Sequence, residues 1–173
     1  TFRDLGQLRN AISPLKQSII FKSDYFDAYT NLALSLYDLG HAEEAITYYE
    51  QAIKIKPDSS ELHCNLGLAL HSLNQYDAAI KSYGHALKIN PCFAEVHCNL
   101  GLVFSDLGQF DAAIKSYEHA LKINPNFAEA HNNLGIVLRD LDQLDAAIKC
   151  HEQALKIKPD FAEAYSNLGV VFS

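Results

Sequence analysis

The stretch AEVHCNLGLVFSDLGQFDAAIKSYEHALKINPNF, residues 94–127, decides the fold of this 173-residue chain. Its pattern of large and small residues returns every 34 residues along most of the sequence. Such a period is typical of proteins whose equivalent units stack side by side into a solenoid. The recurring positions are Gly67, Gly101 and Gly135; Ala79, Ala113 and Ala147; Tyr83, Tyr117 and His151; and Pro91, Pro125 and Pro159.

Each 34-residue unit is predicted to form two amphipathic helices. Apolar residues recur three and four positions apart from Ala94 to about Leu107, and again from about Asp111. A glycine recurs in the middle of the first helix, where it costs about 1 kcal/mol relative to alanine. This recurrence predicts that a neighbouring helix approaches closely. The positions are Gly67, Gly101, Gly135 and Gly169.

The residues that join the helices fit the same plan. Between the two helices of a unit stand residue types that tolerate the left-handed conformation ending a helix. They are Gly6, Gly40, Asn74, Gly108 and Asp142. A proline follows each second helix and disfavours helix at the preceding residue. These prolines are Pro57, Pro91, Pro125 and Pro159.

Over nearly the whole chain this pattern resembles the tetratricopeptide repeat (TPR) family. The resemblance implies an all-α fold, a right-handed superhelical solenoid of antiparallel helix pairs, with four full repeats plus half repeats at both ends. The expected units are 1–25 (partial and degenerate), 26–59, 60–93, 94–127, 128–161 and 162–173 (the first helix of a further repeat). We therefore expect a fragment of a longer solenoid that binds other proteins.

The first unit departs from the pattern. The segment around Gly6 aligns with the end of a first helix at Gly108, so a turn is expected at Gly6. Pro14 then falls inside the second helix and should kink it. Ser18 and Ser23 replace the usual alanine and proline.

Composition and charge exclude several classes of function. The formal net charge of −7 argues against nucleic acid as a partner. No apolar run is long enough to span a membrane, and no catalytic or cofactor-binding motif is present. We therefore expect no membrane partner, no cofactor and no enzyme activity in this chain, and leave the parent protein open. Four cysteines without a CxxC pair fit a reducing, cytoplasmic setting.

One asparagine recurs in every first helix and is the strongest candidate for function. Asparagine is a mediocre helix former, but its amide can both donate to and accept from the backbone of an extended peptide. The alternative is a purely structural role. The five positions, called the asparagine ladder, are Asn31, Asn65, Asn99, Asn133 and Asn167.

In TPR proteins this position faces the concave groove, where other residues would join it. An apolar strip follows three residues after each asparagine, although these residues could instead pack between repeats. The strip is Leu34, Leu68, Leu102, Ile136 and Val170. Acidic residues that end first helices favour neutral or basic peptide partners. They are Asp38, Asp106 and Asp140.

The asparagine ladder, with a phenylalanine before Ala-Glu in several units, is similar to the superhelical TPR domain of O-linked N-acetylglucosamine transferases. The phenylalanines are Phe93, Phe127 and Phe161. The resemblance implies that the asparagines hold acceptor polypeptides and that aspartates in the groove help to select side chains.

Two other patterns bear on chemistry. His63, His97 and His131 could belong to a zinc or copper site, but Tyr29 and Tyr165 occupy the same position, which favours a packing role. Chaperone-binding TPR proteins clamp a carboxylate with lysine and arginine, and the corresponding positions in this chain carry neither, so no carboxylate clamp is expected. They hold Thr30, Cys64, Cys98, Asn132 and Ser166.

Three functions stay open at this point. The first is a scaffold that binds an extended segment of another protein. The second is the substrate-recognition arm of a larger glycosyltransferase-like enzyme, which the reading frame beyond Ser173 would reveal. The third is head-to-tail self-association through the incomplete first unit and the uncovered final helix, a contact that would propagate.

Overall fold

Ten α-helices make up the described part of the chain, which is residues 2–22 and 25–172 of a computed structural model. No strand occurs among these residues, so the predicted all-α class is confirmed. The helices are α1 (Phe2–Phe21), α2 (Phe26–Asp38), α3 (Ala42–Ile55), α4 (Ser60–Ser72), α5 (Tyr76–Ile89), α6 (Ala94–Asp106), α7 (Phe110–Ile123), α8 (Ala128–Asp140), α9 (Leu144–Ile157) and α10 (Ala162–Val171).

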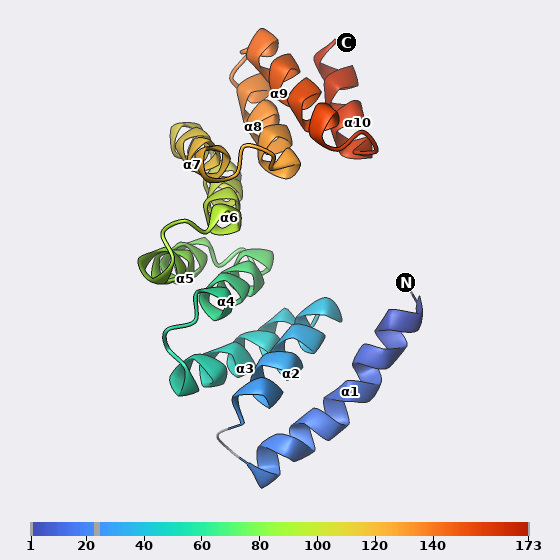
Figure 1. Cartoon of the computed structure of the whole chain (residues 1–173), viewed down its shortest axis with the longest axis vertical. Coiled ribbons are helices and arrows are strands. Elements are labelled where there is room, and N and C mark those ends of the chain that lie inside the picture. Colours follow the sequence, from blue (N-terminus) through green and yellow to red (C-terminus); the bar gives the residue numbers. More distant parts are fainter. Residues whose placement is uncertain (1, 23–24, 173) are drawn as a thin grey trace. The chain divides into compact units, whose positions relative to one another are not determined.

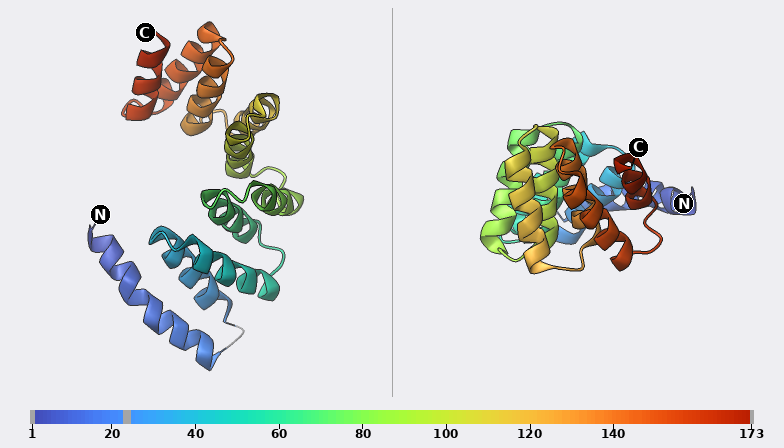
Figure 2. Two further views of the ribbon diagram at one scale, coloured as in Figure 1. Left: turned by 180° about the vertical axis from the view of Figure 1, so that it is seen from behind. Right: turned by 90° about the horizontal axis from the view of Figure 1, so that it is seen from above.

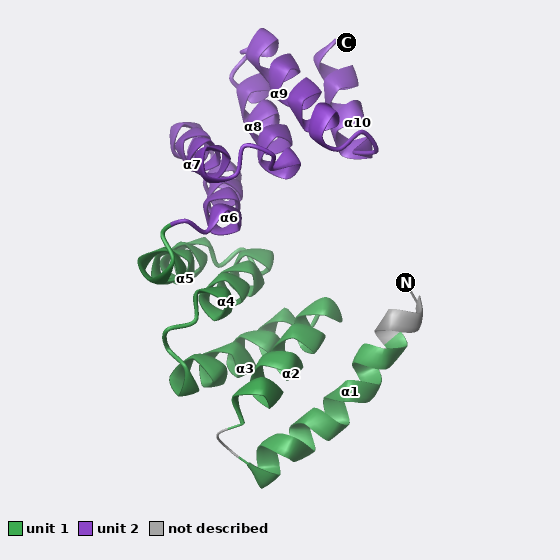
Figure 3. Ribbon diagram, viewed as in Figure 1, with its two compact units in different colours: residues 1–91 green, residues 92–173 purple. Residues whose placement is uncertain are grey.

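The helices belong to two compact units, residues 1–91 and 92–173 (Figure 3). In unit 1, α1 packs against α2, and the antiparallel pairs are α2–α3 and α4–α5 (Figure 1). In unit 2 the pairs are α6–α7 and α8–α9, and α10 packs against α9. Consecutive pairs also contact each other, α3 with α4 and α7 with α8, as the further views of Figure 2 show.

A glycine facing an aromatic ring lies at the centre of three helix pairs. A β-carbon placed on the glycine would lie 2.5, 2.5 and 2.7 Å from the nearest ring atom in the pairs Gly67–Tyr83, Gly101–Tyr117 and Gly135–His151. The rings are buried. The predicted close approach is therefore confirmed at these glycines. It is wrong at Gly169, which has nothing within 4 Å, because no second helix follows α10 among the described residues.

The turns inside the helix pairs have the predicted left-handed conformation. The φ angles are 83°, 57°, 68° and 60° at Gly40, Asn74, Gly108 and Asp142. After Gly108, the Gln109 amide donates to the Phe104 carbonyl at 2.8 Å and so satisfies a carbonyl at the end of α6. The second helices end two residues before each proline, at Ile55, Ile89, Ile123 and Ile157, as predicted.

The predicted turn at Gly6 is wrong. Gly6 lies inside α1, a single helix of 20 residues that also runs through Pro14. Glycine permits a left-handed turn but does not require one, and within a helix it costs only about 1 kcal/mol relative to alanine. The Ser18 hydroxyl donates to the Pro14 carbonyl at 3.0 Å. Ser23 lies outside the described residues, and the kink at Pro14 stays a prediction.

Candidate functional site

The asparagine ladder occupies one equivalent position in five helices. Each asparagine stands five residues after the first residue of α2, α4, α6, α8 or α10. Asn31 is exposed and the other four are half-buried. Two of the five belong to unit 1 and three to unit 2. Every side chain of the ladder is therefore at least partly accessible.

In unit 2 two of the ladder amides, those of Asn133 and Asn167, are held by the preceding repeat. The Asn167 Nδ2 group donates to Asn132 Oδ1 at 3.0 Å. The Asn133 Nδ2 group lies 3.9 Å from Cys98 Sγ in the same arrangement. An asparagine amide has two N–H donors and one oxygen. One internal bond therefore orients the side chain and leaves its oxygen and second N–H for a ligand.

A buried polar network supports Asn167. His151 and Asn132 are both 0% exposed, and His151 Nδ1 lies 3.1 Å from Asn132 Oδ1. An amide oxygen can only accept, so Nδ1 carries the hydrogen and donates. The Asn132 amide nitrogen donates in turn to Glu163 Oε1 at 3.4 Å. Asn132 thus links the core of α9 to two residues of α10.

The other nitrogen of this histidine, His151 Nε2, is buried without a hydrogen-bond partner. It lies against Gly135, 2.9 Å from where a β-carbon would stand. Burial lowers the pKa of His151, and the nearby Arg139 cation lowers it further. The imidazole is therefore neutral at neutral pH.

The residues predicted to accompany the ladder differ in exposure. The apolar strip is half-buried at Leu34, Leu68, Leu102 and Ile136 and exposed at Val170. The three aspartates are exposed. Asp140 is paired with the neighbouring guanidinium, because Arg139 Nη2 lies 2.7 Å from its Oδ1. The pairing reduces the charge that Asp140 offers to a ligand.

The positions compared with a carboxylate clamp face the interior in the middle repeats. Cys64, Cys98 and Asn132 are buried. Burial raises the pKa of the Cys98 thiol to about 11. In unit 2, Cys98 and Asn132 therefore contact ladder asparagines from the interior side.

The histidines that could have bound a metal are half-buried, and two of them contact the loops between repeats. His63 Nε2 lies 3.1 Å from the Pro57 carbonyl oxygen, and His131 Nε2 lies 3.0 Å from that of Pro125. The rings of His63 and His85 stack with centroids 5.3 Å apart. Across residues 2–22 and 25–172, no group of three or more potential metal ligands occurs.

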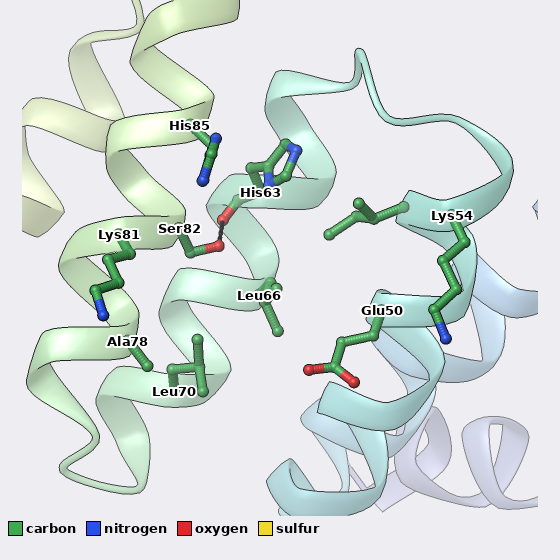
Figure 4. A pocket seen from close by; sticks show the side chains of 10 residues that line it. Glu50, Lys54, His63, Leu66, Leu70, Ala78, Lys81, Ser82 and His85 are labelled. Atoms are coloured by element: carbon green, nitrogen blue, oxygen red, sulfur yellow. Dashed lines mark hydrogen bonds between the residues drawn. The ribbon is translucent and has the colours of Figure 1, made fainter.

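Unit 1 also carries a groove that the sequence pattern did not reveal. It lies between α3 and α5, over one face of α4, and has a volume of about 540 Å³ (Figure 4). Small residues of α5, Ala78 and Ser82, leave the space open. The spacing of four residues places Ala78 and Ser82 on one side of α5, and this is the signal that could have indicated the groove.

Comparison with known proteins places the chain in a family. A model of the TPR repeat matches residues 34–74, 69–108, 103–142 and 137–173, so the chain belongs to the TPR repeat family. This confirms the predicted TPR solenoid class. No curated protein matches the chain.

Solved TPR structures share the fold. A crystal structure of MamA is 26% identical with a TM-score of 0.82, over 93% of this chain and 94% of that one. YrrB, described as a TPR protein with an unusual peptide-binding site, is 21% identical with a TM-score of 0.75, over 95% and 84%. PilF from Pseudomonas aeruginosa is 21% identical with a TM-score of 0.78, over 85% and 67%.

The length and apolar character of the helices can be compared with those that a membrane-spanning helix needs. None in the described part of the chain combines the length and apolar character needed to cross a membrane.

Proposed function

We propose that this chain is a protein-interaction scaffold whose asparagine ladder binds the backbone of an extended peptide. The observation that carries the proposal is the orientation of Asn133 and Asn167 by side chains 35 residues earlier. A preoriented amide loses less conformational freedom on binding. The peptide-binding site named for YrrB, a protein of the same fold, supports this class of function.

The spacing of the asparagines suits an extended ligand. Neighbouring packed helices lie about 8–10 Å apart, and an extended chain rises about 3.3 Å per residue. Within one unit, consecutive asparagines would then meet roughly every third peptide residue. Amide contacts to the backbone give affinity without side-chain selection. The exposed Asp38 and Asp106 would favour neutral or basic segments.

The test compares peptide-array binding by the chain and by a variant with Asn65, Asn99 and Asn133 changed to alanine. Asn126→Ala is the control, because this exposed asparagine lies in a loop outside the ladder. Both variants should keep the helicity of the parent chain by circular dichroism. The proposal expects loss of binding only in the triple variant, and equal binding by all three proteins would refute it.

The role as a substrate-recognition arm of a glycosyltransferase-like enzyme is a narrower form of this proposal. It has the same ladder chemistry and adds a catalytic domain elsewhere in the parent protein. The parent reading frame would show whether it encodes a catalytic domain, and a glycosyl-transfer assay on the complete protein would test whether that domain is active.

Head-to-tail self-association is a second candidate, favoured by uncovered apolar residues. Tyr165 and Phe172 of the α10 segment are 57% and 69% exposed, and Ile20 and Phe21 of α1 are 79% and 88% exposed. Gly169 also lacks the ring that covers the equivalent glycines. Sedimentation equilibrium over a wide concentration range tests this candidate, because a strictly monomeric mass at high concentration would exclude it.

A further inference from the structure

The groove on unit 1 has an apolar floor and polar walls. Leu66 and Leu70 of α4 form the floor, with Ile53 of α3 and Ala78 of α5 beside them. The Ser82 hydroxyl is turned away from a ligand, because it donates to the His63 carbonyl at 2.9 Å (Figure 4). The volume of about 540 Å³ lies in the range of sites that bury a ligand group.

The walls carry more positive than negative charge. Lys54 of α3 and Lys81 of α5 stand on opposite sides of the groove, and both are exposed (Figure 4). Glu50 is the single carboxylate among the residues that line it. His63 and His85 stack at one end, and burial lowers the pKa of His63, so that this ring adds no charge at neutral pH. This local excess contrasts with the net charge of −7 of the chain.

The groove and the ladder use different sides of α4. His63, Leu66 and Leu70 lie three and four residues apart and form one stripe of the helix. At 100° per residue, Asn65 and Leu68 lie on roughly the opposite side. Neither lines the groove. A ligand in the groove therefore leaves the ladder of unit 1 accessible.

We infer that this groove is a second binding site, which takes a large apolar side chain flanked by carboxylates on a segment of a partner protein. The apolar floor accommodates the side chain, because burying it removes apolar surface from water on both partners. The lysines on the two walls receive the flanking carboxylates. Charge complementarity selects this acidic segment over the neutral or basic peptides expected at the ladder.

The experiment is a fluorescence-anisotropy titration of the whole chain with three labelled peptides. The probe is Asp-Glu-Phe-Asp-Glu, and the matched peptides are Lys-Arg-Phe-Lys-Arg and Asp-Glu-Ser-Asp-Glu. The first should bind saturably and at least about tenfold more tightly than the other two. Equal affinity for the acidic and basic peptides, or no saturable binding of the probe, overturns the inference.

Charge-reversal variants locate the binding. The double variant Lys54→Glu and Lys81→Glu should weaken probe binding by about tenfold or more. Its control is Lys122→Glu with Lys149→Glu, which changes the same repeat positions 68 residues later on α7 and α9. If the control variant loses as much affinity as the groove variant, the probe responds only to net charge and the inference fails.

A steric variant separates this site from the ladder. Ala78→Phe places a ring in the groove and should abolish probe binding while helicity is kept. The triple ladder variant with Asn65, Asn99 and Asn133 changed to alanine should bind the probe as the parent chain does. Loss of probe binding in the ladder variant would assign the acidic peptide to the ladder and overturn the inference.

Discussion

The ring of Tyr117 occupies the space that a side chain on Gly101 would need, because a β-carbon there would lie 2.5 Å from Tyr117 Cε1. Tyr117 is 1% exposed, so its ring cannot move aside without disturbing the packing of α6 on α7. The glycine, which costs helix stability, thus permits a large ring to be buried at the centre of the pair.

Substituting Gly101 by alanine is therefore expected to destabilise the chain. The overpacking penalty should be about 1–3 kcal/mol and should exceed the gain of about 1 kcal/mol in helix propensity. Gly169→Ala is the matched control, since nothing lies within 4 Å of it; that substitution should raise stability slightly. Urea unfolding followed by circular dichroism measures both. If the Gly101→Ala variant were more stable than the parent chain, the contact with the Tyr117 ring would not outweigh the gain in helix propensity.

The pair of Asn132 and His151 is expected to be energetically coupled. The equivalent residues of the two preceding repeats are cysteine and tyrosine, at Cys64 with Tyr83 and at Cys98 with Tyr117. His151→Tyr alone breaks the bond to Asn132 Oδ1 and leaves a buried amide partly unsatisfied. Adding Asn132→Cys restores the arrangement of the other repeats and should recover part of the loss.

A double-mutant cycle on urea-unfolding free energies measures this coupling. The interaction energy should fall in the range of about 0.5–3 kcal/mol that is found for contacting residues. Single-variant effects that simply add would contradict the hydrogen bond between the two side chains.

Lowering the pH should reduce the folding stability of the chain, because His151 is buried in its neutral form. Its pKa is lowered in the folded state from the ordinary 6.5, so the unfolded chain binds more protons below that pH. The contribution of His151 is therefore complete above pH 6.5, declines as the pH falls towards the lowered folded pKa, and declines no further below it. Arg139 and Glu163 are the charged groups that face this network.

The free energy of unfolding in urea is measured from pH 7.5 to 5 for the parent chain and for the variant that carries both Asn132→Cys and His151→Tyr. The parent should lose more stability over this interval than the variant. The pKa of His63 is also lowered, and its contribution is common to both proteins. Identical pH slopes would show that His151 does not contribute.

The sequence was sufficient to predict the helix pairs, four left-handed turns and three glycine contacts, because each depends on positions that recur in the complete repeats. It was wrong about a turn at Gly6 and a close contact at Gly169, which lie in the partial units. It did not predict the bonds of Asn133 and Asn167, since these join positions 35 residues apart that a 34-residue alignment treats as unrelated. The groove was also missed, because residues of three helices line it and the residue types that α5 contributes recur on α7, so the repeat pattern alone does not single it out.

The thiols should differ in reactivity according to their burial. Cys92 is exposed, Cys150 is half-buried, and Cys64 and Cys98 are buried. With a pKa of about 11, Cys98 at pH 8 is ionised in only about one molecule in a thousand. A disulfide reagent should therefore label Cys92 rapidly in the folded chain and Cys98 only on unfolding. Mass spectrometry of the labelled peptides assigns each site, and Cys92→Ser should remove the fast phase. Rapid labelling of Cys98 under native conditions would mean that the contact between α6 and α8 that holds Asn133 opens readily.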